Sequence, residues 1–388
     1  MGRPPVDYRG RSIGAVSEIQ EVLAAIAELA ERNEHMALAT IVATRGSTYR
    51  RAGARYLVPA TGEPIGNLSG GCLEDDVARA GREVMSSGEP RLMTFDMTAD
   101  GEEIWGYGLG CNGAIDVFVE PAAMAVETAS AFRAAIEENR PAALVTVIET
   151  AKHGDVLLGA RLLVEADGVL RGGISATFDD AARQAAIAAL ATGRSQVVPL
   201  GDTARAFVEV ARPPLRLVIC GAGHDVIPLV RQAAALGWRL VVADVRRNLL
   251  NHERFPEATS FVDAAPLDAA QAIGADERTA VLLMSHNYLR DGEYLRSFAQ
   301  AGIARLVYLG VLGPRGRSAR LLRELEADGV TLTDEDQSRL HAPAGLDLGA
   351  EEPEEVAAAL IAEILAVERG HSGRPLRETT GPIHGESR

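Results

Sequence analysis

Cysteine is scarce in this sequence, with three residues among 388 at positions far apart along the chain. So few cysteines exclude a disulfide framework, and neither a Cys-x-x-Cys pair nor a paired-histidine spacing is present for a zinc site. The sequence also lacks an uncharged apolar run of about 18 residues that could span a bilayer. Its first residues have no apolar core or cleavage signal for secretion. A reducing cytoplasm is therefore the expected compartment.

Positive charge is also in short supply. Lysine and arginine number 39 against 54 aspartates and glutamates, for a formal net charge of −15. A strongly negative chain is repelled by phosphate backbones, and no basic patch stands out along the sequence. We expect neither a nucleic-acid partner nor a membrane anchor.

The length and the hydrophobic content of 47% are enough for two or three domains, because one core rarely grows beyond about 250 to 300 residues. Region 12–211 mixes helical periodicity with short apolar strands, which predicts a mixed α/β domain ending at Pro213 and Pro214. Region 215–369 alternates strictly between strands and helices, which predicts a Rossmann-like, doubly wound parallel sheet. Residues 370–388 are polar and aperiodic and should form a disordered tail. No internal repeat at a fixed period is visible.

The second region opens with the parts of a dinucleotide-binding βαβ unit, "LRLVICGAGHDVIPLVRQAAALGWRLVVADVR". Gly221 and Gly223 allow a sharp turn that brings backbone N–H groups against a pyrophosphate at the start of a helix. Asp244 follows the second strand, where an acid can hold a ribose hydroxyl. Val226 stands at the third glycine position and should loosen the helix against the strand. The segment predicts NAD(P) or another adenine nucleotide as ligand, and the alternative is a turn that keeps the fold without the ligand.

Polar residues follow two more predicted strands, and strand ends of a doubly wound sheet face one crevice. The stretch "MSHNYLRD" offers His286 and Asp291 as catalytic residues if the protein is an enzyme. The alternative for His286 is capping of the next helix. The stretch "YLGVLGPRGR" resembles an anion cradle of backbone N–H and guanidinium groups, with Gly310, Gly313 and Arg315 as candidate contacts.

Two cysteines are flanked by glycine. Cys72 follows Gly70 and Gly71 where a helix is expected to begin, and Cys111 lies in "GLGCNG". The helix macrodipole favours a thiolate at Cys72, whereas the acids at 74–76 in the same turn oppose it. Close approach of a ligand and tight packing are the two alternatives for these cysteines.

Seven motifs, in order along nearly the whole chain, carry a family resemblance. The first region holds "LATIVATRGSTYRRAGARYLV", "GNLSGGCLEDDV" and "GYGLGCNGAIDVFVE". The second holds "VICGAGHDVIPLVRQAAALGW", "MSHNYLRDGEYL", "YLGVLGPRGR" and "HAPAGLDLGAEEPEEVAAALIAEILA". Together they resemble the XdhC/CoxI family, accessory factors of molybdenum hydroxylases such as xanthine dehydrogenase.

The resemblance implies a cytoplasmic chaperone that binds the molybdenum cofactor, a molybdopterin. Such a protein protects the cofactor while a cysteine desulfurase installs the terminal sulfido ligand, and delivers it to the large subunit of an apo molybdenum hydroxylase. Cys72 and Cys111 would then stand near molybdenum, which a soft sulfur can approach. The arginines of "TRGSTYRRAGAR", the first of them Arg45, would pair with the cofactor phosphate. The complete dehydrogenase is excluded, since it needs iron–sulfur cysteines that this chain lacks.

Two other functions stay open at this point. One is an NAD(P)-dependent oxidoreductase that uses the Gly221 turn, with His286 as general acid or base. The other is an interaction module with an empty Rossmann domain. Whether the protein is an enzyme, and whether it forms a homodimer, is left open by the sequence.

Overall fold

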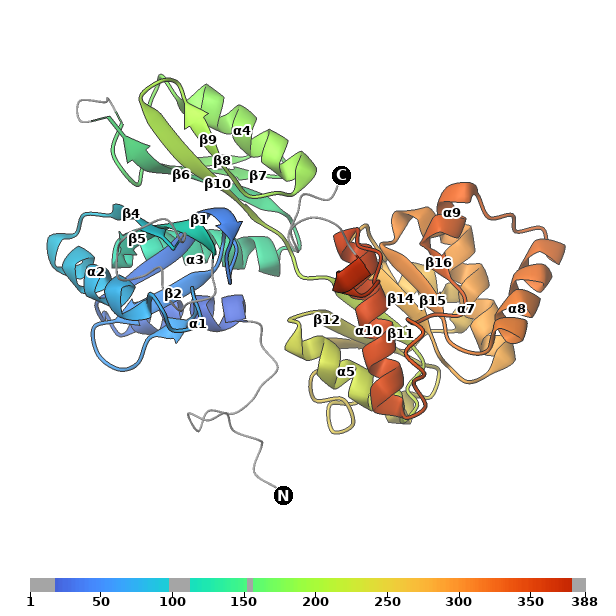
Figure 1. Ribbon diagram of the computed structural model, residues 1–388. Helices are drawn as coiled ribbons and strands as arrows, with labels where there is room; N and C mark the ends of the chain where they lie inside the picture. The colour runs from blue at the N-terminus through green and yellow to red at the C-terminus, as the bar shows by residue number, and fades with distance from the viewer. Residues whose placement is uncertain (1–17, 98–111, 152–155, 379–388) are drawn as a thin grey trace. The chain divides into compact units, whose positions relative to one another are not determined.

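The computed structural model describes residues 18–97, 112–151 and 156–378. They form two compact units, Glu18–Pro213 and one that begins at Pro214, and each is considered by itself (Figure 1). Within these ranges we find no helix with the length and apolarity that a membrane span requires. Of the predicted tail, the described part contains one 3-10 turn, Leu376–Glu378, and the rest lies outside the described residues, as do residues 12–17 of the first predicted domain.

The N-terminal unit contains two five-stranded antiparallel sheets, ordered β3-β2-β1-β5-β4 and β8-β7-β6-β10-β9. The first half of the unit, Glu18–Pro121, consists of α1 (Glu18–Glu31), β1 (Met36–Ser47), β2 (Arg55–Pro59), β3 (Ile65–Gly66), α2 (Glu74–Ser87), β4 (Arg91–Asp96) and β5 (Asn112–Pro121). The second half, Ala122–Ala211, consists of α3 (Ala122–Glu137), β6 (Ala142–Thr150), β7 (Arg161–Glu165), β8 (Leu170–Gly173), α4 (Asp179–Thr192), β9 (Gln196–Leu200) and β10 (Ala204–Ala211).

The two halves are copies of one fold, so the expectation of no internal repeat is wrong. Each runs helix, three strands, helix, two strands, and the strands pair in the same order. Met36 and Ala142 begin equivalent strands 106 positions apart, and "GARYLV" at 53–58 returns as "GARLLV" at 159–164. Asn33 and Asn139, after α1 and α3, have positive φ angles of 53° and 54°. The repeat spans about a hundred residues, which hides it from a search for short periods.

The halves contact each other reciprocally. Arg55 of the first half donates to Glu209 of the second at 2.7 Å, and Arg161 of the second donates to Glu120 of the first. Arg55 and Arg161 occupy equivalent positions in the two halves. Glu120 and Glu209 are also equivalent, because in the strand register Glu120 lies opposite the third residue of β1 and Glu209 lies opposite the third residue of β6. Such exchange of contacts is the signature of a two-fold interface. The apolar contact between the halves has the same symmetry. Val42 and Phe118 of the first half form one cluster with Ile148 and Phe207 of the second half.

The second unit is a six-stranded parallel sheet in the order β13-β12-β11-β14-β15-β16. This is the Rossmann order, so the predicted fold class is confirmed. Helices α5 and α10 cover one face, while α6, α7 and α8 cover the other (Figure 1).

The strands of this sheet are β11 (Arg216–Cys220), β12 (Arg239–Ala243), β13 (Ser260–Val262), β14 (Thr279–Leu283), β15 (Tyr308–Val311) and β16 (Leu340–His341). The helices are α5 (Val226–Ala235), α6 (Ala269–Ile273), α7 (Tyr288–Ala301), α8 (Arg315–Ala327), α9 (Asp334–Arg339) and α10 (Pro353–Arg369).

Val226 is fully buried in the core beneath α5. The loosening expected from a valine at the third glycine position is therefore not seen, because its side chain fills space between helix and sheet.

Candidate functional site

The turn between β11 and α5 is shaped by glycine. Gly221 has φ +134°, and a Cβ at this position would lie 2.5 Å from the carbonyl oxygen of Met284. The ends of β11 and β14 can approach this closely only because the residue has no side chain. The role of Gly221 seen here is backbone packing.

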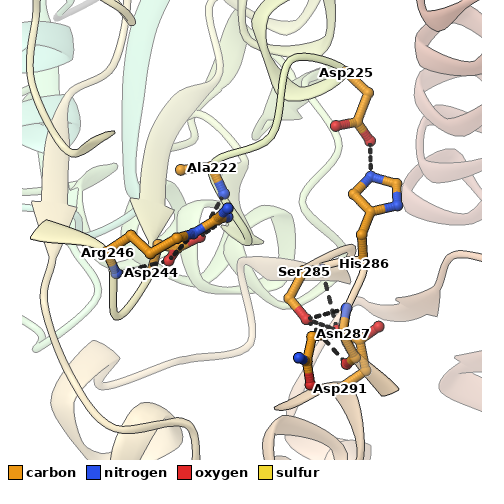
Figure 2. Close-up of polar contacts among 8 residues, drawn as sticks. All are labelled: Ala222, Asp225, Asp244, Arg246, Ser285, His286, Asn287 and Asp291. Carbon is orange, nitrogen blue, oxygen red and sulfur yellow. Dashed lines mark hydrogen bonds and ion pairs between the residues drawn. The ribbon is translucent and has the colours of Figure 1, made fainter. Parts of the chain in front are cut away.

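Asp244 lies at the end of β12 and faces this turn. Its carboxylate is buried and accepts hydrogen bonds from the Ala222 N–H at 2.8 Å and from the Arg246 N–H at 2.8 Å (Figure 2). The Arg246 guanidinium adds bonds from Nε at 2.9 Å and Nη2 at 2.6 Å. Burial by itself would raise the pKa of Asp244, but the bonds from Arg246 and Ala222 lower it below its usual value. The oxygens expected to hold a ribose are thus already bonded within the chain.

Asp291, in α7, is almost completely buried. Its Oδ1 accepts from the Ser285 hydroxyl at 2.5 Å and from the Ser285 N–H at 3.1 Å, and its Oδ2 accepts from Arg317 at 2.5 Å. Arg317 also donates to the Leu312 carbonyl at 3.0 Å. These bonds fasten β14, α7 and α8 to each other at the strand ends. The structure shows a structural role for Asp291, and its catalytic role stays a prediction.

His286 has two unusual features. It is a non-glycine residue with positive φ, 55°, and 59% of its side chain is exposed. Its Nε2 lies 2.7 Å from Asp225 Oδ2 at the start of α5 (Figure 2). The capping alternative is wrong, because the Asn287 side chain caps α7 by accepting from the Arg290 N–H. Asp225 was missed by the sequence reasoning, although an acid two residues after Gly223 was a visible signal.

The predicted anion cradle after β15 is only partly free. Gly310 lies inside β15, where a Cβ would come within 2.6 Å of the Tyr308 ring, so that its lack of a side chain serves packing. Gly313 has φ +130° in the turn to α8. Arg315 is exposed, and we find no hydrogen bond or ion pair between it and any described residue. Among the three candidates, Arg315 is the residue with a charged side chain, and that charge is available to a ligand.

In the N-terminal unit, one side chain organises the first glycine loop, residues 66–73. Glu74 accepts hydrogen bonds from the N–H groups of Leu68, Ser69, Gly71 and Leu73 and from the Ser69 hydroxyl. Burial would raise the pKa of Glu74, but these bonds, led by the Ser69 hydroxyl, lower it. The loop amides are therefore bonded inside the loop rather than open to an external anion.

Cys72 is half-buried in this loop. It borders a very small pocket, with a volume of about 10 Å³, together with Thr48, Tyr49 and Arg50. Gly70 and Gly71 beside it are exposed and have positive φ angles of 79° and 108°. Cys111, the other predicted contact, lies outside the described residues.

The arginines near the pocket already have acidic partners. Arg45 makes two bonds to Asp116, at 2.8 and 3.0 Å, although 53% of its side chain is exposed. Arg50 makes two bonds to Glu18, at 2.9 and 2.7 Å. Arg45 is neutralised by a carboxylate that the sequence did not reveal, and its pairing with a cofactor phosphate stays a prediction.

Comparison with known proteins bears on both units. The model described as "XdhC and CoxI family" matches residues 29–96 and 135–201, and the one described as "XdhC Rossmann domain" matches 217–364. A relative in Bacillus subtilis (strain 168), named as a probable xanthine dehydrogenase subunit, is 30% identical over 341 residues, 87% of this chain and 94% of that protein. The chain belongs to the XdhC and CoxI family. The two stretches matched by the first model fall one in each half of the N-terminal unit.

Two further proteins are similar to this member of the XdhC and CoxI family over most of the chain. The molybdenum cofactor insertion chaperone PaoD of Escherichia coli (strain K12) is 23% identical over 330 residues, 85% of this chain and 82% of PaoD. A crystal structure from Bacillus halodurans, described as a xanthine dehydrogenase, has a TM-score of 0.73 at 27% identity and covers 92% of this chain and 98% of that one. The fold is thus shared along both units.

Proposed function

We propose that this protein is an accessory factor of a molybdenum hydroxylase of the xanthine dehydrogenase type. In this proposal it binds the molybdenum cofactor during sulfuration and hands it to the apo-enzyme. The observation that supports this most directly is the similarity to PaoD along 85% of the chain, because PaoD is named for insertion of that cofactor. The Bacillus subtilis relative, whose name refers to xanthine dehydrogenase, points to the same class of client.

We assign the cofactor contact to the first glycine loop. The internal repeat supports this choice, because the second half keeps the loop architecture without the cysteine. There Asp179 accepts from the N–H groups of Ile174 and Ser175 at 2.6 and 3.1 Å, as Glu74 does in the first half. The stretch 172–179, "GGISATFD", has no thiol. The two loops therefore differ in the presence of a thiol. Of the two, only the first can offer molybdenum a soft ligand, the sulfur of Cys72.

The charges around the loop limit how a cofactor phosphate can bind. Because Arg45 and Arg50 are held by Asp116 and Glu18, a phosphate must replace a carboxylate to reach either guanidinium. Guanidinium groups pair with phosphate in the same two-bond geometry as with carboxylate, so such an exchange is chemically feasible. The displaced carboxylate can bind the guanidinium again when the phosphate leaves, which suits a carrier.

The remaining parts of the proposal follow from the family role. They are a cysteine desulfurase and the large subunit of the apo-hydroxylase as partners, and the cytoplasm as the place of action. Cys111 is included as a second sulfur contact because the family resemblance implies both cysteines near molybdenum.

Cofactor loading tests the proposal. The full chain is purified from a host that makes molybdenum cofactor, and bound molybdenum and oxidised pterin are measured per folded protein. We expect Cys72→Ser to carry several-fold less of both, because serine keeps the volume but removes the soft ligand. Thr177→Ser, in the matching loop of the second half, is the control and should load normally. Full loading of Cys72→Ser would remove Cys72 from the proposal, and an unloaded wild-type chain would overturn the proposal itself.

A further inference from the structure

The turn after β11 carries a carboxylate at the place where a dinucleotide fold brings phosphate to the backbone. A Cβ built on Gly223 would lie 2.3 Å from Asp225 Oδ1, so the Asp225 side chain folds back over this glycine. In dinucleotide-binding folds the second glycine of the turn is small because the pyrophosphate approaches the backbone there. Here the group that takes advantage of the missing side chain is the chain's own carboxylate.

His286 holds this carboxylate in place. Its Nε2 is 2.7 Å from Asp225 Oδ2, and its Cδ2 lies 3.5 Å from the same Cβ position on Gly223. Asp225 is the N-cap residue of α5, yet its side chain accepts no capping hydrogen bond from the helix. The interaction with His286 thus replaces the usual capping contact and aims the carboxylate across the turn rather than along the helix.

The backbone at His286 is adapted to the same contact. A φ of 55° is uncommon for a residue with a side chain and costs free energy that neighbouring contacts must offset. This conformation brings the imidazole from the end of β14 to the start of α5. Gly221 supports the approach, since any side chain there would meet the backbone of Met284 and Ser285.

We propose that Asp225, held by His286, is an autoinhibitory contact that keeps phosphate-bearing ligands out of the β11–α5 turn. A nucleotide phosphate at the turn meets the Asp225 carboxylate both sterically and as a like charge. It can bind the glycine turn only after the carboxylate has left Gly223. A nucleoside without phosphate does not need that space and is insensitive to Asp225.

The experiment measures binding of NAD⁺, AMP and adenosine to the full chain by calorimetry. The variants are Asp225→Asn, which removes the charge, and Asp225→Ser, which also clears the space and keeps a residue favoured at N-caps. We expect affinity for NAD⁺ and AMP to rise at least about tenfold in both, the size expected for removing a like charge a few ångströms away. Affinity for adenosine should stay as in wild type.

Asp268→Asn is the matched control. Asp268 is the N-cap residue of α6, is exposed, and likewise makes no capping bond, but it is remote in sequence from the turn. It should leave all three affinities unchanged. Equal affinity of the Asp225 variants and wild type for NAD⁺, no binding by any form, or an equal gain for adenosine would each overturn the proposal. Circular dichroism confirms that every variant tested is folded.

Discussion

Charged residues that the sequence marks as ligand contacts are, in several cases, bonded within the chain. Arg45 binds Asp116, Asp244 binds Arg246, and Asp291 binds Arg317. A charge at the end of a buried strand needs a partner, because an unpaired charge removed from water is costly. In the Arg45–Asp116 pair the buried charge is that of Asp116, and its partner is 71 positions away in sequence. The sequence therefore indicates which residues gather at the strand ends, but the pairing depends on the tertiary fold.

Asp244→Asn is expected to destabilise the second unit. The substitution weakens bonds to the Ala222 N–H and to Arg246 that a charged acceptor makes strong, and we expect a loss of about 1 to 3 kcal/mol at pH 7. Because folding lowers the pKa of Asp244, the wild-type advantage exists above the ordinary aspartate pKa. It disappears as pH falls through the lower, folded-state value.

Urea unfolding of wild type and Asp244→Asn across a pH series checks this expectation. The difference in free energy of unfolding should be constant near neutrality and should narrow below about pH 4. Asp268→Asn serves again as the control. A difference that is absent at pH 7, or that widens in acid, contradicts the role given to Asp244.

At the level of helices and strands, elements with a regular apolar periodicity could be predicted from the sequence, and short exposed strands could not. The strict alternation of strands and helices predicted for residues 215–369 matches the parallel sheet of β11, β12, β14 and β15 and the helices between its strands. Strands β4, β8 and β9 are exposed or only partly buried and lack a long apolar pattern, so the sequence gives little sign of them. Such strands are held by hydrogen bonds to a neighbour, which local sequence does not encode.

The first glycine loop depends on a side chain of the helix that follows it. Glu74→Gln should loosen the loop, because an amide cannot accept from all the N–H donors that the carboxylate satisfies. If the loop presents Cys72 to the cofactor, the variant loses stability and also carries less molybdopterin. The lowered pKa of Glu74 places the stability loss above the ordinary glutamate pKa, fading as pH falls through the folded-state value.

The second half supplies the control for this element. Asp179→Asn removes the equivalent carboxylate from the loop without a cysteine, and it should cost stability while leaving cofactor load unchanged. Thermal unfolding and pterin content, measured on the same samples, separate the two effects. If both variants lose cofactor in proportion to their instability, Glu74 has no positioning role.

At the scale of the molecule, the N-terminal unit has the organisation of a dimer within one chain. Its halves share one apolar core, to which α1 contributes Ile26 and α3 contributes Phe132. The ion pairs Arg55–Glu209 and Arg161–Glu120 run in both directions between the halves. The repeated "GAR" segment was visible in the sequence, but sheet order and reciprocal contacts were needed to show that it marks a duplication.

This organisation makes a prediction about the first half alone, residues 18–121. Arg55 is 2% exposed in the full unit, and separation of the halves leaves it and the adjoining apolar core without cover. Both members of the symmetric ion pair, Arg55 and Glu120, are present in the fragment, so two copies can give each other the contacts that the second half provides. We expect a two-fold dimer that loses secondary structure on dilution, because a lone half cannot bury its shared core.

Sedimentation and circular dichroism over a concentration series measure the assembly and the folding of this fragment. Glu120→Arg is expected to prevent assembly, and Glu89→Arg, at an exposed position, is its control. A fragment that stays folded as a monomer at low concentration would show that the halves are independent domains, and the reciprocal pairs would then be incidental to folding.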